Sequence, residues 1–195
     1  MSTPNQWRKR HHLPVLSSRE DLFYARMEVD VASTSFKEGK QFRISYEYIG
    51  VGSTPLVIRF SSPVDFSLQG QDLTSDLVGV RYRVFRAAQG TPGGTFGTPI
   101  QITRSNGTSD AKPLNPLVTI FTGGTFTPTA GQEAQETIRI RTPSGSKKAL
   151  SVSGKPGDER GLPAGDHYII LQSIDGNKLA SGVLNLEWEE LRPTE

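Results

Sequence analysis

The segment 157–176, GDERGLPAGDHYIILQSIDG, contains the densest group of side chains that can do acid-base chemistry. Five of them lie within ten residues: Asp158, Glu159, Arg160, Asp166 and His167. A glycosidase needs two carboxylates that face each other across a cleft, roughly 5 to 10 Å apart. Neighbouring residues of an extended chain point to opposite sides, which separates Asp158 from Glu159. The sequence therefore favours a tight structural loop that leads into a strand.

His167 is the one histidine outside the N-terminal segment, and we expect a hydrogen-bonded residue at the edge of a strand rather than a general base. A Ser-His-Asp triad built from distant residues stays open, although no G-x-S-x-G elbow supports it. His11 and His12 are neighbours that have no third or fourth metal ligand in view. The chain contains no cysteine, which excludes thiolate catalysis and Cys-type zinc sites. We therefore expect no enzyme, no cofactor and no metal.

Charge and hydropathy narrow the classes of partner that the chain is expected to bind. The 195 residues carry a formal net charge of +2, which does not call for a nucleic-acid partner at the level of the whole chain. No apolar run approaches the roughly 20 residues of a membrane helix. The basic N-terminus lacks the apolar stretch of a signal peptide. We expect a soluble protein that is not exported by the general secretory route and does not bind a membrane.

Residues 1–34 differ from the rest of the chain and are interpreted as an arm that a partner orders. A short helix is expected from Ser18, before the alternating segment MEVDVAS. Apolar groups among bases suit a protein interface, where tryptophan and arginine are common anchors. Stacking of Trp7 on nucleic acid is a weaker alternative, because three basic residues provide few phosphate contacts. The expected partner-binding residues are Trp7, Arg8, Lys9, Arg10, Leu13, Val15 and Leu16.

From Ser35 to the end, apolar residues alternate with polar ones and turn residues separate the runs. In QFRISYEYI, for example, the aromatic and isoleucine positions fall on one face. HYIILQSI is apolar on both faces at its centre, which predicts a central strand. About ten such strands predict an all-β fold, an antiparallel sandwich or barrel over residues 35–195.

Two glycine-rich loops echo each other, GGTFGTP at 93–99 and GGTFTPT at 123–129. They are expected to be two similar surface loops rather than a true repeat, and neither has the Lys-Ser/Thr ending of a phosphate-binding loop. Phe96 and Phe126 are the candidate anchors, either tucked under their own loops or pressed into a neighbouring molecule. Trp188, in the last strand, is expected to be a core or interface residue.

Several stretches of the chain resemble small virion proteins of tailed bacteriophages. Among these stretches are FRISYEYI, PVDFSLQGQDL, GVRYRVFRA, VTIFTGGTF and GVLNLEWEEL. The chain is most similar, over 41–192, to the capsid decoration or cement proteins of podovirus-type phages. The resemblance implies a β-sandwich, often a jelly roll, that sits outside the capsid and clamps neighbouring major capsid subunits. It also implies a dimer or trimer on the particle and no catalytic residues.

The expected function is therefore that of a capsid decoration protein. Its partner would be the major capsid protein, and its location the exterior of the virion after synthesis in the host cytoplasm. The alternative is a tail or neck appendage that binds host-surface carbohydrate, and a hydrolase is a distant third. Both tryptophans lie away from the loops, in the arm and in the last strand. Because a sugar site needs exposed aromatic platforms, this distribution favours decoration over carbohydrate binding.

Overall fold

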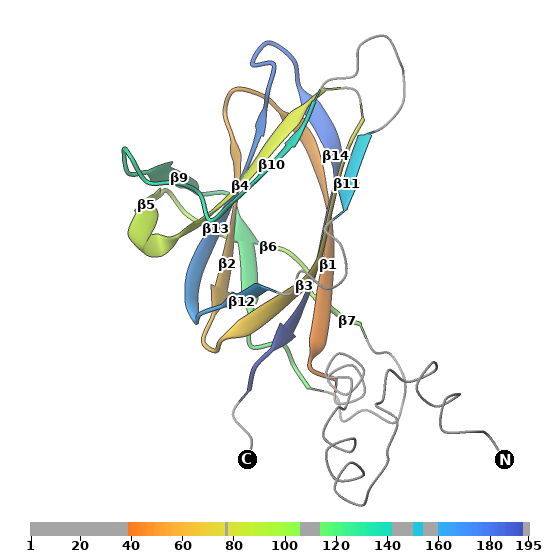
Figure 1. Ribbon diagram of the computed structural model, residues 1–195, viewed down its shortest axis with the longest axis vertical. Helices are drawn as coiled ribbons and strands as arrows, with labels where there is room; N and C mark the ends of the chain where they lie inside the picture. The colour runs from red at the N-terminus through yellow and green to blue at the C-terminus, as the bar shows by residue number, and fades with distance from the viewer. Residues whose placement is uncertain (1–38, 77, 106–113, 142–149, 154–159, 193–195) are drawn as a thin grey trace, which may run out of the picture.

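The computed structural model describes residues 39–76, 78–105, 114–141, 150–153 and 160–192, and all of its regular sheets are antiparallel (Figure 1). The arm, the expected helix at Ser18 and the segment MEVDVAS lie outside these residues. Within them, strands account for nearly all regular structure, with one short 3-10 helix, η1 (Ala87–Gln89). None of the described residues forms a helix with the length and apolar character that a membrane crossing requires.

The described residues form fourteen strands in three sheets. Sheet A has the order β11-β3-β14-β1-β7, and β12 also pairs with β3. Its strands are β1 (Gln41–Val51), β3 (Phe66–Ser75), β7 (Thr103–Arg104), β11 (Leu150–Ser153), β12 (Arg160–Leu162) and β14 (Ala180–Glu190). Sheet B has the order β10-β4-β13-β2-β8-β6. Its strands are β2 (Leu56–Ser62), β4 (Val80–Arg86), β6 (Thr98–Pro99), β8 (Thr119–Thr122), β10 (Glu136–Ile140) and β13 (Gly165–Ser173). Sheet C is the ribbon of β5 (Gly90–Gly93) and β9 (Thr125–Pro128).

The pairing of the long strands is nested. The first strand, β1, pairs with the last, β14, and β2 pairs with β13. Further in, β3 pairs with β11 and β4 pairs with β10. Along the chain from β1 to β4, successive strands alternate between sheets A and B. The described chain therefore forms one long antiparallel hairpin that folds over on itself into a two-layer sandwich.

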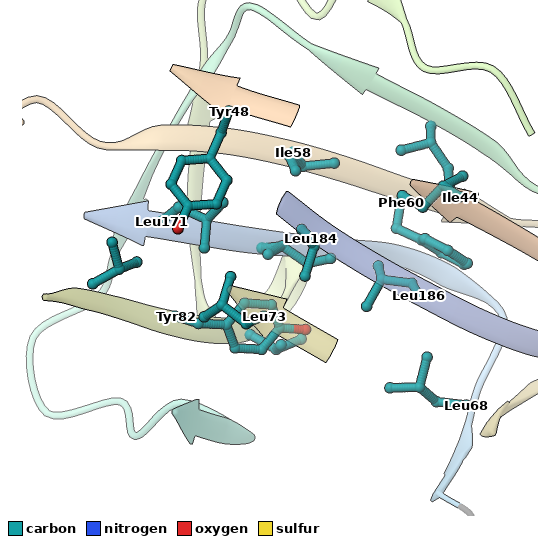
Figure 2. Packing of buried hydrophobic residues seen from close by; sticks show 14 of the residues in the cluster. Ile44, Tyr48, Ile58, Phe60, Leu68, Leu73, Tyr82, Leu171, Leu184 and Leu186 are labelled. Atoms are coloured by element: carbon teal, nitrogen blue, oxygen red, sulfur yellow. The ribbon is translucent and has the colours of Figure 1, made fainter. Parts of the chain in front are cut away.

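The sandwich core lies between sheets A and B, and the period-two pattern explains which side chains enter it. Figure 2 shows Ile44, Leu184 and Leu186 of sheet A packed with Ile58, Phe60 and other residues of sheet B. Trp188 is fully buried at one end of this core. Its ring meets Phe60 edge-on, with centroids 5.0 Å apart, which confirms that Trp188 is a core residue.

A second, smaller apolar cluster lies on the other face of sheet B. Its members alternate with the core residues along the same strands: Val57, Phe85, Tyr168 and Ile170, covered by Phe126 from β9. Phe96 and Ala134 pack against it from the side. We call the segments 87–99 and 123–134, which cover this face, the flap. Sheet B is consequently buried on both faces at one end, as the apolar run of β13 predicts.

The sequence predictions of an all-β sandwich and of a central β13 are confirmed. The alternating run PIQITRS, at 99–105, does not form one strand, because β6 joins sheet B and β7 joins sheet A. The strands β5, β9, β11 and β12 are too short for the period to reveal them. That the sandwich is of the jelly-roll type stays a prediction.

Candidate functional site

The seven arm residues expected to bind a partner, from Trp7 to Leu16, lie outside the described residues. Asp158 and Glu159 also lie outside them, so the segment 157–176 is described only from Arg160 onward. From there, β12 pairs with β3 and β13 enters sheet B. The part of this segment that the structure describes therefore forms strands and the turn between them.

His167 is not the edge residue that the sequence predicted. It lies in β13, between Phe60 of β2 and Arg86 of β4, and only 3% of its surface is exposed. The prediction was wrong because both neighbouring strands extend as far as His167, which places it inside the sheet. Its ring stands edge-on to Phe66, with centroids 5.4 Å apart.

The His167 ring is held as a neutral imidazole. Its Nε2–H donates to the carbonyl oxygen of Pro163 at 3.0 Å, and the buried Nδ1 has no hydrogen-bond partner among the described residues. Burial lowers the pKa of His167, while the hydrogen bond to Pro163 opposes part of that shift. A buried ring whose donor is already engaged fits a structural role better than a general base.

The polar residues of the described chain form no metal cluster. No group of three or more His, Cys, Asp or Glu residues converges within the parts that the structure describes. Near His167, Asp166 accepts only a long hydrogen bond from the Tyr168 hydroxyl, at 3.5 Å. Desolvation raises the pKa of Tyr168, and the charge of Asp166 adds to the rise.

The two GGTF loops lie side by side rather than at separate places. β5 pairs with β9 and β6 pairs with β8, so the segments 90–99 and 119–128 run antiparallel along each other. A Cβ on Gly124 would come within 2.3 Å of the Phe96 ring. The second loop therefore needs glycine where the first loop's aromatic ring crosses it.

Phe126 and Phe96 take different positions in the flap. Phe126 is buried and stacks on Tyr168, with ring centroids 4.2 Å apart and planes inclined by 14°. Phe96 is half-buried, 5.7 Å from the Tyr168 ring, and the guanidinium of Arg59 lies 5.2 Å from its centroid. Of the two alternatives for these anchors, the structure therefore places Phe126 under the flap, while Phe96 keeps an accessible side.

A polar groove of about 580 Å³ crosses the outer face of sheet A. Its walls include Arg43, Asp72, Asn185 and Glu187, which alternate with core residues of β1, β3 and β14. Gly70 pairs with Glu187, and its missing side chain deepens the groove beside a bulge of β3. Sequence analysis did not predict this groove, although a lone glycine within FSLQGQDL is the usual sign of a bulge.

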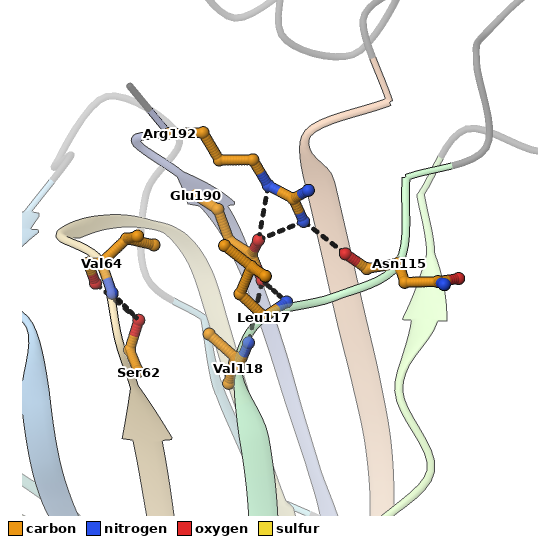
Figure 3. A network of polar contacts seen from close by, with 7 residues as sticks. All are labelled: Ser62, Val64, Asn115, Leu117, Val118, Glu190 and Arg192. Carbon is orange, nitrogen blue, oxygen red and sulfur yellow. Dashed lines mark hydrogen bonds and ion pairs between the residues drawn. The ribbon is translucent and has the colours of Figure 1, made fainter. Parts of the chain in front are cut away.

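An ion pair between the buried Glu190 and the partly exposed Arg192 closes the end of the sandwich near the start of β1 (Figure 3). The Glu190 carboxylate accepts hydrogen bonds from the backbone N–H groups of Leu117 and Val118, at 2.8 and 3.1 Å. Its other oxygen accepts from Nε and Nη2 of Arg192. Arg192 also donates to the carbonyl oxygen of Asn115. These contacts tie the end of β14 to the 115–118 segment, so the pair acts as a structural clamp.

Comparisons with family models, with curated proteins and with solved structures found no match to this chain. The candidate interaction surfaces therefore rest on the geometry above. They are the polar groove of sheet A, the accessible side of the flap, and the outer face of sheet B beyond the flap.

Proposed function

We propose that this chain is a capsid decoration protein that binds the outside of a phage capsid and clamps neighbouring major capsid subunits. The observation that carries the proposal is the nested pairing of β1 with β14, β2 with β13, β3 with β11 and β4 with β10. A long hairpin rolled up in this order supports a jelly roll, an architecture found in viral capsid and lectin domains. The nested strands run from Gln41 to Glu190, within the stretch 41–192 that resembles decoration proteins.

We further propose that the protein works by binding and performs no catalysis. The support is the structural use of His167, whose ring is buried and donates to Pro163. Assays on glycan and ester substrates test this proposal, with the variants Asp158→Asn and Glu159→Gln as controls. Turnover that either substitution abolishes would overturn it.

The arm is proposed to reach onto a neighbouring subunit, either of the capsid or of a second copy in a dimer or trimer. Many weak contacts repeated on a lattice resist dissociation together, even where each one alone is weak. Deleting residues 2–16 should leave the melting temperature nearly unchanged and weaken attachment to capsids. Full occupancy of particles by the truncated protein at every salt concentration would show that the arm is dispensable.

Binding to capsid shells tests the function directly. The purified protein is mixed with shells that lack it, and bound protein is separated by sedimentation and counted per particle. We expect saturable binding to the shell exterior and a higher temperature of shell disruption. Failure to bind intact shells would overturn the decoration proposal.

The groove of sheet A favours one second candidate, a tail or neck appendage that binds carbohydrate. Asp72, Asn185, Glu187 and Arg43 are side-chain types that hydrogen-bond sugar hydroxyls, and they share one concave face. However, no aromatic side chain of the described residues lines this groove to stack on a sugar ring. Binding to a host polysaccharide that Asn185→Ala abolishes, with none to shells, would favour the appendage.

A further inference from the structure

Three arginines project from the outer face of sheet B beyond the flap. Arg81 and Arg83 alternate with the core residues Val80, Tyr82 and Val84 of β4, so they point away from the core. Arg139 of β10 alternates in the same way. Arg139 pairs directly with Arg81 across the two strands, and the next pair along the same face brings Thr137 opposite Arg83. We call this set of three side chains the arginine face.

The arginine face works against the stability of the fold. Like charges placed directly opposite each other on antiparallel strands are destabilising. Burial lowers the pKa of Arg83, and the charge of Arg81 lowers it further. Among the ion pairs and hydrogen bonds of the described residues, none connects these three arginines to a carboxylate. The repulsion between these arginines is therefore not balanced by a carboxylate within the described chain.

Protection of a sheet edge does not explain the arrangement. β10 is the edge strand of sheet B, where a charged residue blocks pairing with other chains. Arg81 and Arg83, however, lie on β4, which is paired on both sides by β10 and β13. The guanidinium of Arg83 also lies over the Phe85 ring, 5.6 Å from its centroid, which restricts its motion. A residue used only for solubility needs no such support.

We propose that the arginine face docks a carboxylate-rich protein surface, which under the proposed function belongs to the capsid shell. Arginine pairs bidentately with carboxylates and is a common interface anchor, particularly where it is restrained beforehand. A carboxylate placed between Arg81 and Arg139 relieves their repulsion at the moment of binding. A set of three charges is small for a nucleic acid, which is bound through many phosphate contacts. The inference rests on the proposed function for the identity of the partner.

The test compares two charge-removing variants of the full chain. The first combines Arg81→Gln, Arg83→Gln and Arg139→Gln. The matched control is Arg104→Gln, an exposed arginine of β7 in sheet A that does not line the groove. Both are measured for binding to shells and for retention on immobilised poly-L-glutamate, at low salt and at about 0.5 M salt. Thermal unfolding checks that each variant is folded.

We expect the triple variant to bind shells and poly-L-glutamate at least about tenfold more weakly than wild type at low salt. Its melting temperature should equal or exceed that of wild type, because the cross-strand repulsion is removed. Arg104→Gln should bind as wild type does. If wild type binds shells and the triple variant binds equally well, the inference is overturned while the decoration function stands.

If wild type does not bind shells, the decoration function fails. Retention on poly-L-glutamate then tests, independently of that function, whether the arginine face binds carboxylates. Retention that the triple substitution removes supports a carboxylate-docking face. Equal retention of both proteins, or no retention of either, overturns it. Tighter binding to oligothymidylate than to poly-L-glutamate would also overturn the choice of a protein partner. A marked fall in the melting temperature of the triple variant would contradict the premise that the face is strained.

Discussion

The ring of Phe126 stacks on the ring of Tyr168, with centroids 4.2 Å apart and planes inclined by 14°. Phe126 comes from the flap, whereas Tyr168 lies at the centre of sheet B. Phe85 completes the cluster, 5.9 Å from Phe126. This stack fastens the flap to the outside of the sandwich, which gives sheet B a second buried face.

Replacing Phe126 by alanine should therefore destabilise the domain. Removal of a buried phenylalanine leaves a cavity and costs about 3 to 5 kcal/mol. Phe96→Ala is the matched control from the echoing loop, and it should cost clearly less because Phe96 is only half-buried. Denaturant unfolding measures both. An unfolding free energy of Phe126→Ala within about 0.5 kcal/mol of wild type would show that the flap does not depend on this stack.

Gly124 should tolerate no side chain while Phe96 keeps its place. An alanine Cβ there would lie 2.3 Å from the Phe96 ring, so the ring must leave its contacts with Tyr168 and Arg59. Gly124→Ala should cost about 1 to 3 kcal/mol of unfolding free energy. Gly97→Ala, whose Cβ would sit 3.6 Å from Thr95, is the control and should be nearly neutral.

A double variant identifies the cause of the Gly124→Ala effect. If the Phe96 ring is responsible, Gly124→Ala should cost little more in a Phe96→Ala background. Equal destabilisation by Gly124→Ala in both backgrounds would contradict the proposed clash. The melting temperatures of the four proteins in the cycle provide the comparison.

Acid should weaken the fold through His167. Its folded-state pKa lies below the usual value of about 6.5, so the unfolded chain binds more protons than the folded one as the pH falls below that value. The contribution of His167 to stability is complete above about pH 6.5 and falls by up to about 1.4 kcal/mol per pH unit below it. His167→Gln keeps an N–H donor and does not titrate.

Urea unfolding from pH 7.5 down to pH 5 compares wild type with His167→Gln. Wild type should lose stability more steeply in this range. The histidines of the arm, His11 and His12, are present in both proteins and cancel in the difference. Parallel pH profiles of the two proteins would show that His167 titrates alike in the folded and unfolded states.

The alternation of β1 and β14 could be predicted from sequence because each has one face in the core. For β1, the buried residues Phe42, Ile44 and Tyr48 follow a strict period of two. The short strands β5 and β9 could not be predicted, because Gly-Thr-Pro-Gly has no apolar face and pairs only through the fold of the flap. Which strands are neighbours depends on contacts between distant segments, which a local pattern does not contain.

The same limit applies to the candidate surfaces. The pattern of β4 shows Arg81 and Arg83 on one face, but only the register with β10 brings Arg139 opposite Arg81. The central position of β13 was predicted from its two apolar faces, while the burial of His167 depends on how far β2 and β4 extend. The groove of sheet A similarly requires Gly70 to meet Glu187 across two strands.

The Glu190 clamp should be among the most sensitive polar sites in the described chain. One carboxylate oxygen accepts two backbone N–H groups and the other accepts the Arg192 guanidinium, so both oxygens face donors only. A glutamine at this position must turn its NH₂ group toward one of these sets of donors, whichever way the amide lies. Glu190→Gln therefore leaves buried backbone donors unsatisfied and breaks the ion pair with Arg192, at a cost of about 1 to 3 kcal/mol. Glu47→Gln, at an exposed position of β1, is the control and should change stability by less than about 0.5 kcal/mol. Urea unfolding of both variants at low and high salt provides the measurement. The Glu190→Gln effect should largely persist at high salt, because the Glu190 carboxylate is buried and bonds two backbone N–H groups. If Glu190→Gln is as stable as Glu47→Gln, the contacts of Glu190 do not fasten the last strand to the 115–118 segment.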